Sequence, residues 1–209
     1  METETVAKLS FVPGEVVQGT VTIQPVNLML VFQVNCPGCL LYALPQLQQL
    51  TDRFPYLNGF ALSTAFEDFA LNNQLNTLAL CNERVLVGAS MQHYARLGQH
   101  MLPYRISVPV LMDWFLPATN VSEIPQRLLQ AMEQESLSPA MVEQIRDKLG
   151  RYLDPVLHSG RTFLNNQFQG TPSWVLFDDQ FEIKNQWFGI KEFEQVCADI
   201  ERYHPLEPS

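Results

Sequence analysis

Three predominantly apolar runs mark the buried strands of this chain. They cover residues 28–32, 58–64 and 106–113, and each ends at polar or turn-forming positions. A continuous apolar run of this length is typical of a strand that is buried on both faces. A different pattern, alternating β-branched positions in residues 16–23, predicts a short strand or hairpin near the N-terminus.

Between the predicted strands, apolar residues recur at the three- and four-residue spacing of a helix that buries one face. The stretch after the first strand has leucines at this spacing and a proline, Pro45, that is expected to kink the helix. A mostly helical stretch follows the second strand, breaks near Gly88 and ends around residue 102. Residues 114–161 are predicted to be helical, and "KEFEQVCADIERY" closes the chain as a helix.

Two segments near the C-terminus, "SWVLFD" and "FEIKNQWF", flank a polar turn and are typical of a β-hairpin. The chain therefore alternates strands and helices before it ends in a hairpin and a helix. This order predicts an α/β fold in which helices cover both faces of a sheet. The length, 209 residues, suits one large domain or a domain with an insertion.

Charge and termini limit the partners and the compartment. Thirteen basic and 22 acidic residues give a net charge of −9, and such a surface repels phosphate backbones, so we expect no nucleic-acid partner. The N-terminus, "METETVAKLS", lacks the basic and apolar regions of a secretory signal, and residues 28–32 are too few to span a bilayer. We expect a cytoplasmic protein without a membrane partner, and the sequence favours no particular oligomeric state.

The reactive residues are concentrated in Cys36-Pro37-Gly38-Cys39, between the first buried strand and its helix. Pro37 fits the first helical turn, where its missing N–H costs nothing. The N–H groups and partial positive charge of a helix N-terminus favour a thiolate at Cys36, where the thiol pKa falls from about 8.5 to about 7 or below. Cys39, one turn further on, can attack a mixed disulfide at Cys36. We therefore predict that Cys36 is the nucleophile and Cys39 the resolving cysteine.

The alternatives are a metal site and a chance pair without chemistry. A zinc site needs four ligands, usually a second C-x-x-C or a close pair of histidines, and neither is present. We therefore expect no metal and no bound cofactor. Cys81 and Cys197 lie in apolar helical stretches and are expected to be buried free cysteines.

Around this motif the sequence resembles the thioredoxin fold, and within it the redoxin and TlpA-like thiol–disulfide oxidoreductases of the AhpC/TSA-like superfamily. "LMLVFQVNCPGCLLYALPQLQQL" is similar to their strand, active site and kinked helix, and "GTPSWVLFDDQFEIKNQWFG" to their cis-proline segment and closing hairpin. The resemblance covers residues 26–113 and 168–203. It implies one thioredoxin-like domain, residues 1–209, with a central mixed sheet flanked by helices. Residues 1–27 would be an N-terminal strand extension and residues 114–161 a helical insertion before the cis-proline segment.

The resemblance also implies roles for single residues. Pro172 would be a cis-proline beside the cysteines, and Thr171 would pair its backbone with the substrate chain. Pro37 and Gly38 would form the active-site loop. The implied activity is disulfide exchange with protein or low-molecular-weight thiol substrates, in either redox direction.

Three positions depart from the pattern of these families. Asn35 stands where an aromatic residue usually precedes the first cysteine, Leu30 where thioredoxin has a buried acid, and Tyr42 where TlpA-like proteins often have a glutamate. The usual proton acceptors for the resolving thiol are therefore missing. The candidate substitutes, which are otherwise solvated loop carboxylates, are Asp113, Glu67 and Asp68. The second hypothesis is accordingly a thioredoxin-fold binding module that keeps the motif without turnover.

Peroxiredoxins share this fold and offer a further alternative. They place a proline seven residues, and Thr or Ser three residues, before the peroxidatic cysteine. Met29 and Gln33 hold these positions before Cys36, and neither matches. Before Cys39 the same positions hold Phe32 and Cys36, which do not match either.

The predicted insertion carries an apolar stripe of period four, formed by Met141, Ile145, Leu149 and Leu153. It could serve as a lid, docking face or dimer surface. The simpler interpretation, which we favour, is that the stripe packs on its own domain.

Overall fold

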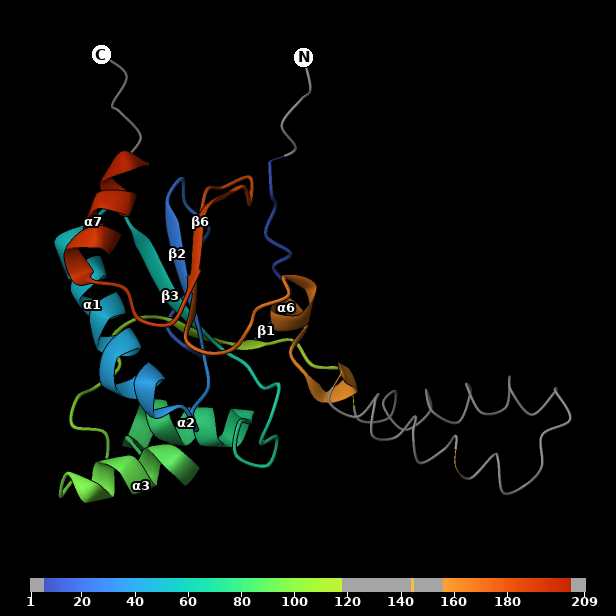
Figure 1. Ribbon diagram of the computed structural model, residues 1–209, viewed down its shortest axis with the longest axis vertical. Coiled ribbons are helices and arrows are strands. Elements are labelled where there is room, and N and C mark those ends of the chain that lie inside the picture. The colour runs from blue at the N-terminus through green and yellow to red at the C-terminus, as the bar shows by residue number, and fades with distance from the viewer. Residues whose placement is uncertain (1–5, 118–143, 145–155, 204–209) are drawn as a thin grey trace, which may run out of the picture.

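A mixed six-stranded sheet in the order β1-β4-β3-β2-β5-β6 forms the centre of the computed structural model (Figure 1). The structure describes residues 6–117, 144 and 156–203. The strands are β1 (Pro13–Gln18), β2 (Asn27–Phe32), β3 (Asn58–Ser63), β4 (Val110–Asp113), β5 (Ser173–Phe177) and β6 (Ile183–Phe188). Strands β2, β3 and β4 run parallel to one another, whereas β1, β5 and β6 pair antiparallel with their neighbours. The predicted α/β class with a mixed sheet is confirmed.

Helices cover both faces of the sheet, as Figure 1 shows. They are α1 (Leu44–Arg53), α2 (Gln74–Glu83), α3 (Gly88–Arg96), α6 (Arg161–Asn165) and α7 (Phe193–Arg202), with a π-helical segment η1 (Cys39–Ala43) directly before α1. Helices α1 and α7 lie on one side, α6 lies on the other, and α2 and α3 lie at the end of the sheet where β2 stops (Figure 1). The predicted break near Gly88 separates α2 from α3.

Strand β2 contributes to both halves of the core because successive side chains point to opposite faces. Leu28, Leu30 and Phe32 pack into the cluster formed with α1 and α7. Met29 and Val31 pack into the second cluster, which includes Phe163 of α6 and Phe177 of β5. All six residues of β2 are buried, as the continuous apolar run predicts. The strand is therefore a rigid base for the turn that follows it.

The helix after β2 is interrupted where the sequence places a proline. It begins at Pro37, widens to the π-helical register over η1 and continues as α1 with Pro45 in its first turn. Proline has no N–H to donate to the carbonyl four residues earlier, so a regular helix cannot pass through this position unchanged. The predicted interruption at Pro45 is thus a π-helical turn directly ahead of it.

The β1–β4 edge of the sheet differs from the prediction. β4 begins at Val110, not at residue 106. Pro109 has no N–H for a ladder, and the side chain of Gln18 bonds the carbonyls of Ile106 and Val108 at 2.8 and 2.9 Å in place of a strand. Near the N-terminus the predicted short strand forms as a single strand, but it covers Pro13–Gln18 and not residues 16–23; the chain turns away at Gly19, where φ is +70°.

The apolar stripe predicted for residues 141–153 falls outside the described residues, so its interpretation stays a prediction, as does the division of the chain into extension and insertion. At the C-terminus the predicted hairpin and closing helix are confirmed: β5 pairs antiparallel with β6, and α7 buries Val196, Cys197 and Ile200. None of the helices in the described part of the chain is long and apolar enough to cross a membrane.

Candidate active site

Cys36 lies where the chain leaves β2 and enters the helix. Its backbone N–H bonds the carbonyl of Gln33 at 3.2 Å, which closes the turn, and helix formation begins at the next residue. The backbone N–H of Cys39 donates to the Cys36 sulfur at 3.2 Å. All four cysteines are free thiols; Cys36 is half-buried and Cys39 is fully buried. The pair therefore has one sulfur open to a partner and one held behind it.

The surroundings push the pKa values of the two thiols apart. The pKa of Cys36 is lowered to about 7, first by a hydrogen bond from the Cys39 side chain and then by the backbone N–H groups of Cys39 and Gly38, against the opposing effect of burial. Burial raises the pKa of Cys39 well above its ordinary value, and the neighbouring Cys36 raises it further. Near neutral pH about half of Cys36 is thiolate, while Cys39 stays a thiol and donates to it.

The segment before β5 completes the site. The Thr171–Pro172 peptide bond is cis, the geometry that the family resemblance implies. The Cys36 thiol donates to the carbonyl oxygen of Thr171 at 3.6 Å. The carbonyl of Pro172 accepts from the N–H of Gly189 at 2.8 Å, which fixes this loop to the end of β6. Thr171 thus meets the cysteine pair at one point, although it lies more than 130 residues further along the chain.

A polar network that the sequence analysis missed holds the turn before Cys36. The side chain of Asn35 accepts from the backbone N–H of Ala89 at 2.6 Å and donates to Asp68 at 2.7 Å, and its backbone N–H donates to Asn72 at 3.0 Å. Gly88, with φ of +52°, is needed there because a Cβ would lie 2.1 Å from the Asn35 oxygen. Asn35 therefore ties the active-site turn to α3 and to the loop after β3, a role that an aromatic residue could not fill.

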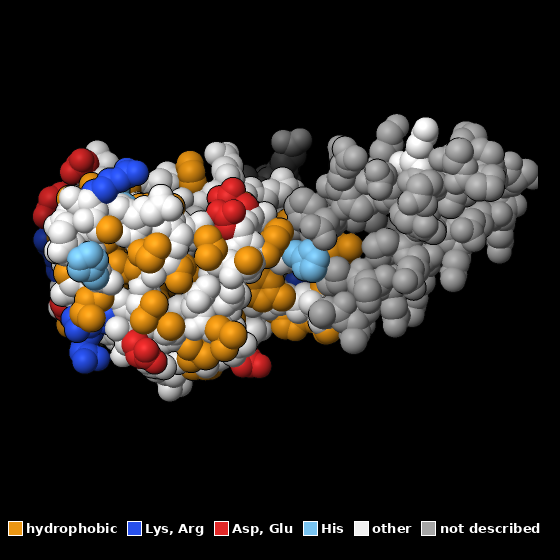
Figure 2. Space-filling model, turned by 90° about the horizontal axis from the view of Figure 1, so that it is seen from below, with side chains coloured by type: hydrophobic (Ala, Val, Ile, Leu, Met, Phe, Trp, Pro, Cys, Tyr) orange, Lys and Arg blue, Asp and Glu red, His pale blue; other side chains and the backbone are white. Residues whose placement is uncertain are grey.

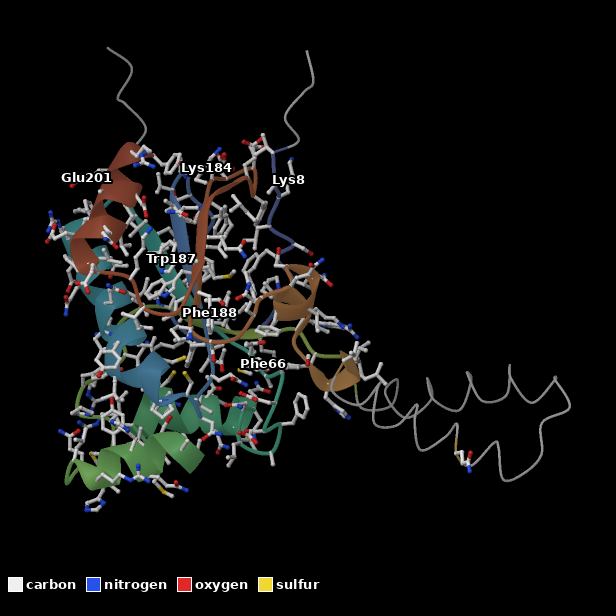
Figure 3. The ribbon with its side chains drawn as sticks, in the orientation of Figure 1. Lys8, Phe66, Lys184, Trp187, Phe188 and Glu201 are labelled. Atoms are coloured by element: carbon white, nitrogen blue, oxygen red, sulfur yellow. The ribbon has the colours of Figure 1, made fainter. Side chains whose placement is uncertain are left out.

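A groove of about 550 Å³ surrounds Cys36 and includes Thr171 and Pro37. Its apolar walls are Phe66, from the loop after β3, and Phe188, from the end of β6; both are labelled near the middle of Figure 3. Gly170 allows the Phe188 ring to lie against the backbone, since a Cβ would approach it to 2.9 Å. The groove gives an extended substrate access to the Cys36 sulfur.

Of the three carboxylates proposed as proton acceptors, Asp113 is a structural residue. It is buried, and its two oxygens accept four hydrogen bonds of 2.8 to 3.1 Å from the hydroxyl of Thr64 and the backbone N–H groups of Trp114, Thr162 and Phe163. It therefore fixes the start of α6. Burial outweighs these bonds and raises its pKa.

Glu67 and Asp68 do line the groove beside Cys36. Neither is among the groups that chiefly set the pKa of Cys39, which are Cys36, Gln33 and Thr171. Leu30 is fully buried and Tyr42 is 58% exposed, so the two positions that carry acids in related families supply no base here. The sequence did carry a signal for the residues that bond Asn35. The polar loop after β3 follows the strand next to β2, so its side chains must lie beside Cys36.

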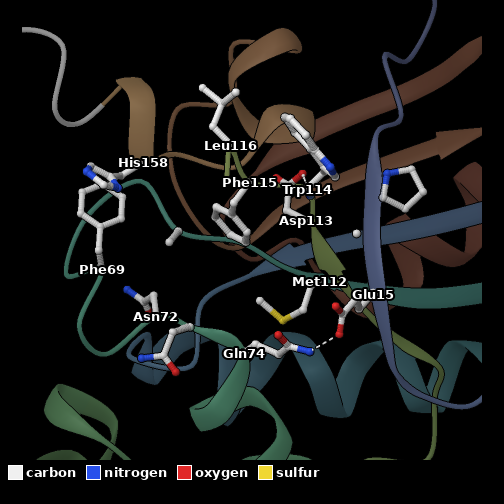
Figure 4. A pocket seen from close by; sticks show the side chains of 14 residues that line it. Glu15, Phe69, Asn72, Gln74, Met112, Asp113, Trp114, Phe115, Leu116 and His158 are labelled. Carbon is white, nitrogen blue, oxygen red and sulfur yellow. Dashed lines mark hydrogen bonds between the residues drawn. The ribbon is translucent and has the colours of Figure 1, made fainter. Parts of the chain in front are cut away.

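A second hollow, of about 580 Å³, lies on the other side of the loop after β3 (Figure 4). It is lined by Phe69, Trp114 and His158 among others, and the rings of Phe69 and His158 lie 5.5 Å apart. Asn72 borders both hollows. Because this second hollow contains neither active-site cysteine, we place the chemistry in the groove around Cys36.

The surface beneath α2 and α3 shows no built site. On this face hydrophobic side chains are interspersed with polar ones and a few charged ones (Figure 2). Met91 of α3 is exposed, as are Leu97 and Met101 just after this helix. Singly scattered apolar side chains need no partner. Within the described part of the chain no cluster of three His, Cys, Asp or Glu side chains is placed to hold a metal ion.

Comparison with known proteins shows the fold. No family model and no curated protein sequence matches the chain. Among solved structures, it is similar to a thioredoxin-like superfamily protein (18% identity, TM-score 0.59, covering 96% of this chain and 99% of that one). It is also similar to a thiol-disulfide isomerase from Corynebacterium glutamicum, with 16% identity and a TM-score of 0.59, covering 98% of this chain and 100% of that one. An uncharacterized conserved protein from Geobacillus kaustophilus matches at 11% identity and a TM-score of 0.50, covering 95% of this chain and 80% of that one. Together with the sheet order and the cysteine pair at the start of the helix, these likenesses establish that the chain has a thioredoxin-like fold.

Proposed function

We propose that this protein is a thiol–disulfide oxidoreductase that exchanges disulfides with protein or small-molecule substrates through Cys36 and Cys39. The observation that carries the proposal is the asymmetry of the pair. One sulfur is accessible with its pKa lowered to about 7, and the other is fully buried with its pKa raised. A low-pKa, accessible thiolate next to a resolving thiol is the arrangement that disulfide exchange requires.

The reaction needs no group beyond the two cysteines and the substrate. The Cys36 thiolate attacks one sulfur of the substrate disulfide, forms a mixed disulfide and releases the first substrate thiolate, which takes up a proton. Cys39 then loses its proton and attacks the Cys36 sulfur, which releases the second substrate thiol. The substrate disulfide gains two electrons and the protein dithiol loses them, so the protein ends with a Cys36–Cys39 disulfide. The reverse sequence oxidises a substrate dithiol.

The cis-proline segment supports this assignment because it lies against the nucleophile. Pro172 has no N–H, and the Thr171 carbonyl lies 3.6 Å from the Cys36 sulfur. We propose that the Thr171 backbone pairs with an extended substrate chain in the groove. We also propose a reducing, cytoplasmic location.

Insulin reduction tests the proposal. With dithiothreitol as reductant, the protein should accelerate the precipitation of insulin chains. Cys36→Ser should abolish the acceleration, because it removes the attacking sulfur. In a separate incubation with insulin and without dithiothreitol, Cys39→Ser should accumulate a mixed disulfide at Cys36, visible by mass spectrometry as an adduct that dithiothreitol then removes. Cys81→Ser, which changes a buried thiol outside the site, is the matched control and should behave like the unmodified protein.

A thioredoxin-fold binding module is the second candidate, because no carboxylate of the described residues is among the groups that chiefly set the pKa of Cys39. A binding module without turnover predicts that the unmodified protein does not accelerate insulin precipitation and that Cys39→Ser forms no mixed disulfide with insulin. Either candidate leaves Cys36 reactive toward small alkylating agents, so that reaction alone does not separate them.

A further inference from the structure

Among the residues that the structure describes, two carboxylates and no basic side chain line the groove around Cys36. They belong to Glu67 and Asp68, both exposed, in the loop after β3. Neither forms an ion pair, since the ion pairs of the described residues join other groups. Asp68 accepts a hydrogen bond from the neutral amide of Asn35, which orients the carboxylate without cancelling its charge. The nucleophile therefore lies in a groove of uncompensated negative charge.

The loop that carries both acids is bonded to the active-site turn through the carboxylate of Asp68 and the backbone of Glu67. The Asn35 amide that holds Asp68 directly precedes Cys36 in the chain. The backbone carbonyl of Glu67 accepts from the side chains of Asn72 at 3.0 Å and Gln33 at 3.4 Å, and Gln33 is itself almost fully buried. Because the loop is bonded to the turn that carries the nucleophile, the charge stays next to the cysteine when a substrate approaches.

The remaining side chains of the groove are uncharged; two aromatic rings form its apolar part, beside polar side chains such as Gln33 and Gln169. Phe188 is 55% exposed although it lines the groove, and Phe66 forms the opposite wall. An aromatic ring can take the alkyl stem of a long basic side chain or interact with its cation, while a carboxylate pairs with the charged end. An apolar wall beside uncompensated acids thus complements lysine or arginine better than an acidic or small polar residue.

We propose that this groove selects cationic disulfides: the occupant is an extended protein segment in which Lys or Arg lies next to the disulfide-bonded cysteine. Anionic disulfides, of which glutathione disulfide is the common cellular example, are disfavoured. The inference rests on the proposed function, since it concerns which substrate the Cys36 thiolate attacks. Two carboxylates at about 8 Å from one charge on the substrate, in water at low salt, raise the association constant of a cation roughly fivefold and lower that of an anion by the same factor. Salt at about 0.5 M should remove most of this effect.

Three small symmetric disulfides of different charge test the inference: cystamine (cationic), hydroxyethyl disulfide (neutral) and dithiodipropionate (anionic). The full-length protein, reduced beforehand and freed of reductant, is mixed with each under single-turnover conditions. Formation of the Cys36–Cys39 disulfide is followed by acid quench, alkylation of remaining thiols and mass spectrometry. Because the three leaving thiols differ in intrinsic reactivity, each rate is divided by the rate of the same disulfide with a neutral model thiol, N-acetylcysteinamide.

The expected result is a charge series at low salt. The normalised rate should fall roughly fivefold from cystamine to the neutral disulfide and roughly fivefold again to the anionic one. The double variant Glu67→Gln/Asp68→Asn should flatten the series. Asparagine keeps the acceptor for Asn35 and tolerates the φ of +47° at position 68. The matched control is Asp52→Asn/Glu83→Gln, which removes two exposed acids outside the groove and should keep the series.

The outcomes separate the inference from the function on which it rests. Equal normalised rates for the three disulfides, or a series that the groove variant leaves unchanged, would overturn the charge selection while the exchange reaction stands. Failure of all three disulfides to oxidise the pair would overturn the proposed function itself. A series that flattens equally in the Asp52/Glu83 control would assign the effect to net charge and also overturn the inference.

Discussion

The side chain of Cys39 should control the pKa of Cys36, and Cys39→Ala is the perturbation that isolates this effect. The largest single cause of the lowered Cys36 pKa is the hydrogen bond from the Cys39 side chain. Alanine removes that donor but leaves the backbone N–H at 3.2 Å from the sulfur. Cys39→Ser is the matched control, because its hydroxyl can still donate. The alanine variant should therefore have a higher Cys36 pKa than the serine variant.

The size of the change follows from the strength of the bond. A hydrogen bond to a charged group contributes about 1.5–3 kcal/mol, and 1.36 kcal/mol corresponds to one pH unit in a titration. Cys36 is half-buried, so water replaces part of the lost donor and the lower end applies. The titration midpoint should move upward by about one pH unit from its value of about 7. The thiolate fraction at pH 7 then falls from about a half to about a tenth.

Alkylation by iodoacetamide as a function of pH measures this midpoint. The rate at pH 7 is a poor readout, since a more basic thiolate is also about threefold more nucleophilic and offsets much of the lost fraction. The midpoint is free of that compensation. Cys81, whose pKa burial raises to about 12, and the buried Cys197 should not compete. Equal midpoints in the alanine and serine variants would refute the reasoning and assign the shift to the backbone N–H groups.

Three further predictions concern other parts of the site. Asp113→Asn should lower the free energy of unfolding by about 1–3 kcal/mol, because the new NH₂ group would face backbone N–H donors. The same variant should leave the titration midpoint of Cys36 unchanged. A shifted midpoint would restore Asp113 as a candidate base. In urea unfolding the reduced protein should gain about 1 kcal/mol more than Cys36→Ala between pH 7 and 8.5, because the pKa of Cys36 is about 7 in the folded state and about 8.5 in the unfolded chain. This gain should be lost as the pH falls through 7. Hydrogen peroxide should oxidise Cys36 slowly, since Met29 and Gln33 occupy the peroxidase positions; a rate typical of dedicated peroxidases, measured by competition, would favour the peroxidase alternative.

The parts of the fold that the sequence predicted correctly are those whose signal is local. β2 is a run of six buried residues, and a continuous apolar run predicts such a strand directly. The Cys-Pro-Gly-Cys stretch predicted the helix start, because proline in the first turn and a preceding buried strand leave few other conformations. β4 was predicted too long: Pro109 was the signal against a strand before Val110, whereas the side chain of Gln18 that bonds the carbonyls of Ile106 and Val108 leaves no local pattern.

The environment of the site was less predictable because it is assembled from loops that are distant in sequence. Asn35 was recognised only as a departure from a family pattern, whereas the structure shows that it joins three segments. Asp113 was proposed as a base from its place at a strand end, and that argument could not show that α6 would consume both its oxygens. Phe188 carries no sequence signal, since its position over Gly170 depends on how β6 meets the cis-proline loop.

If Cys36 and Cys39 exchange disulfides as we propose, the order of the two steps follows from the causes of the raised Cys39 pKa. Burial is the largest, and the hydrogen bond and charge of Cys36 come next. While Cys36 is a thiolate, Cys39 gains by remaining a thiol that donates to it. Once Cys36 is bonded to the substrate its sulfur is neutral, and both of those causes vanish, whereas the hydrogen bonds from Gln33 and Thr171 that lower the Cys39 pKa remain. Cys39 therefore ionises more readily in the mixed disulfide than in the free dithiol, and burial is the part of the barrier that remains. With Leu30 in the place of a buried acid, resolution depends on this loss of charge at Cys36 more than on a dedicated base.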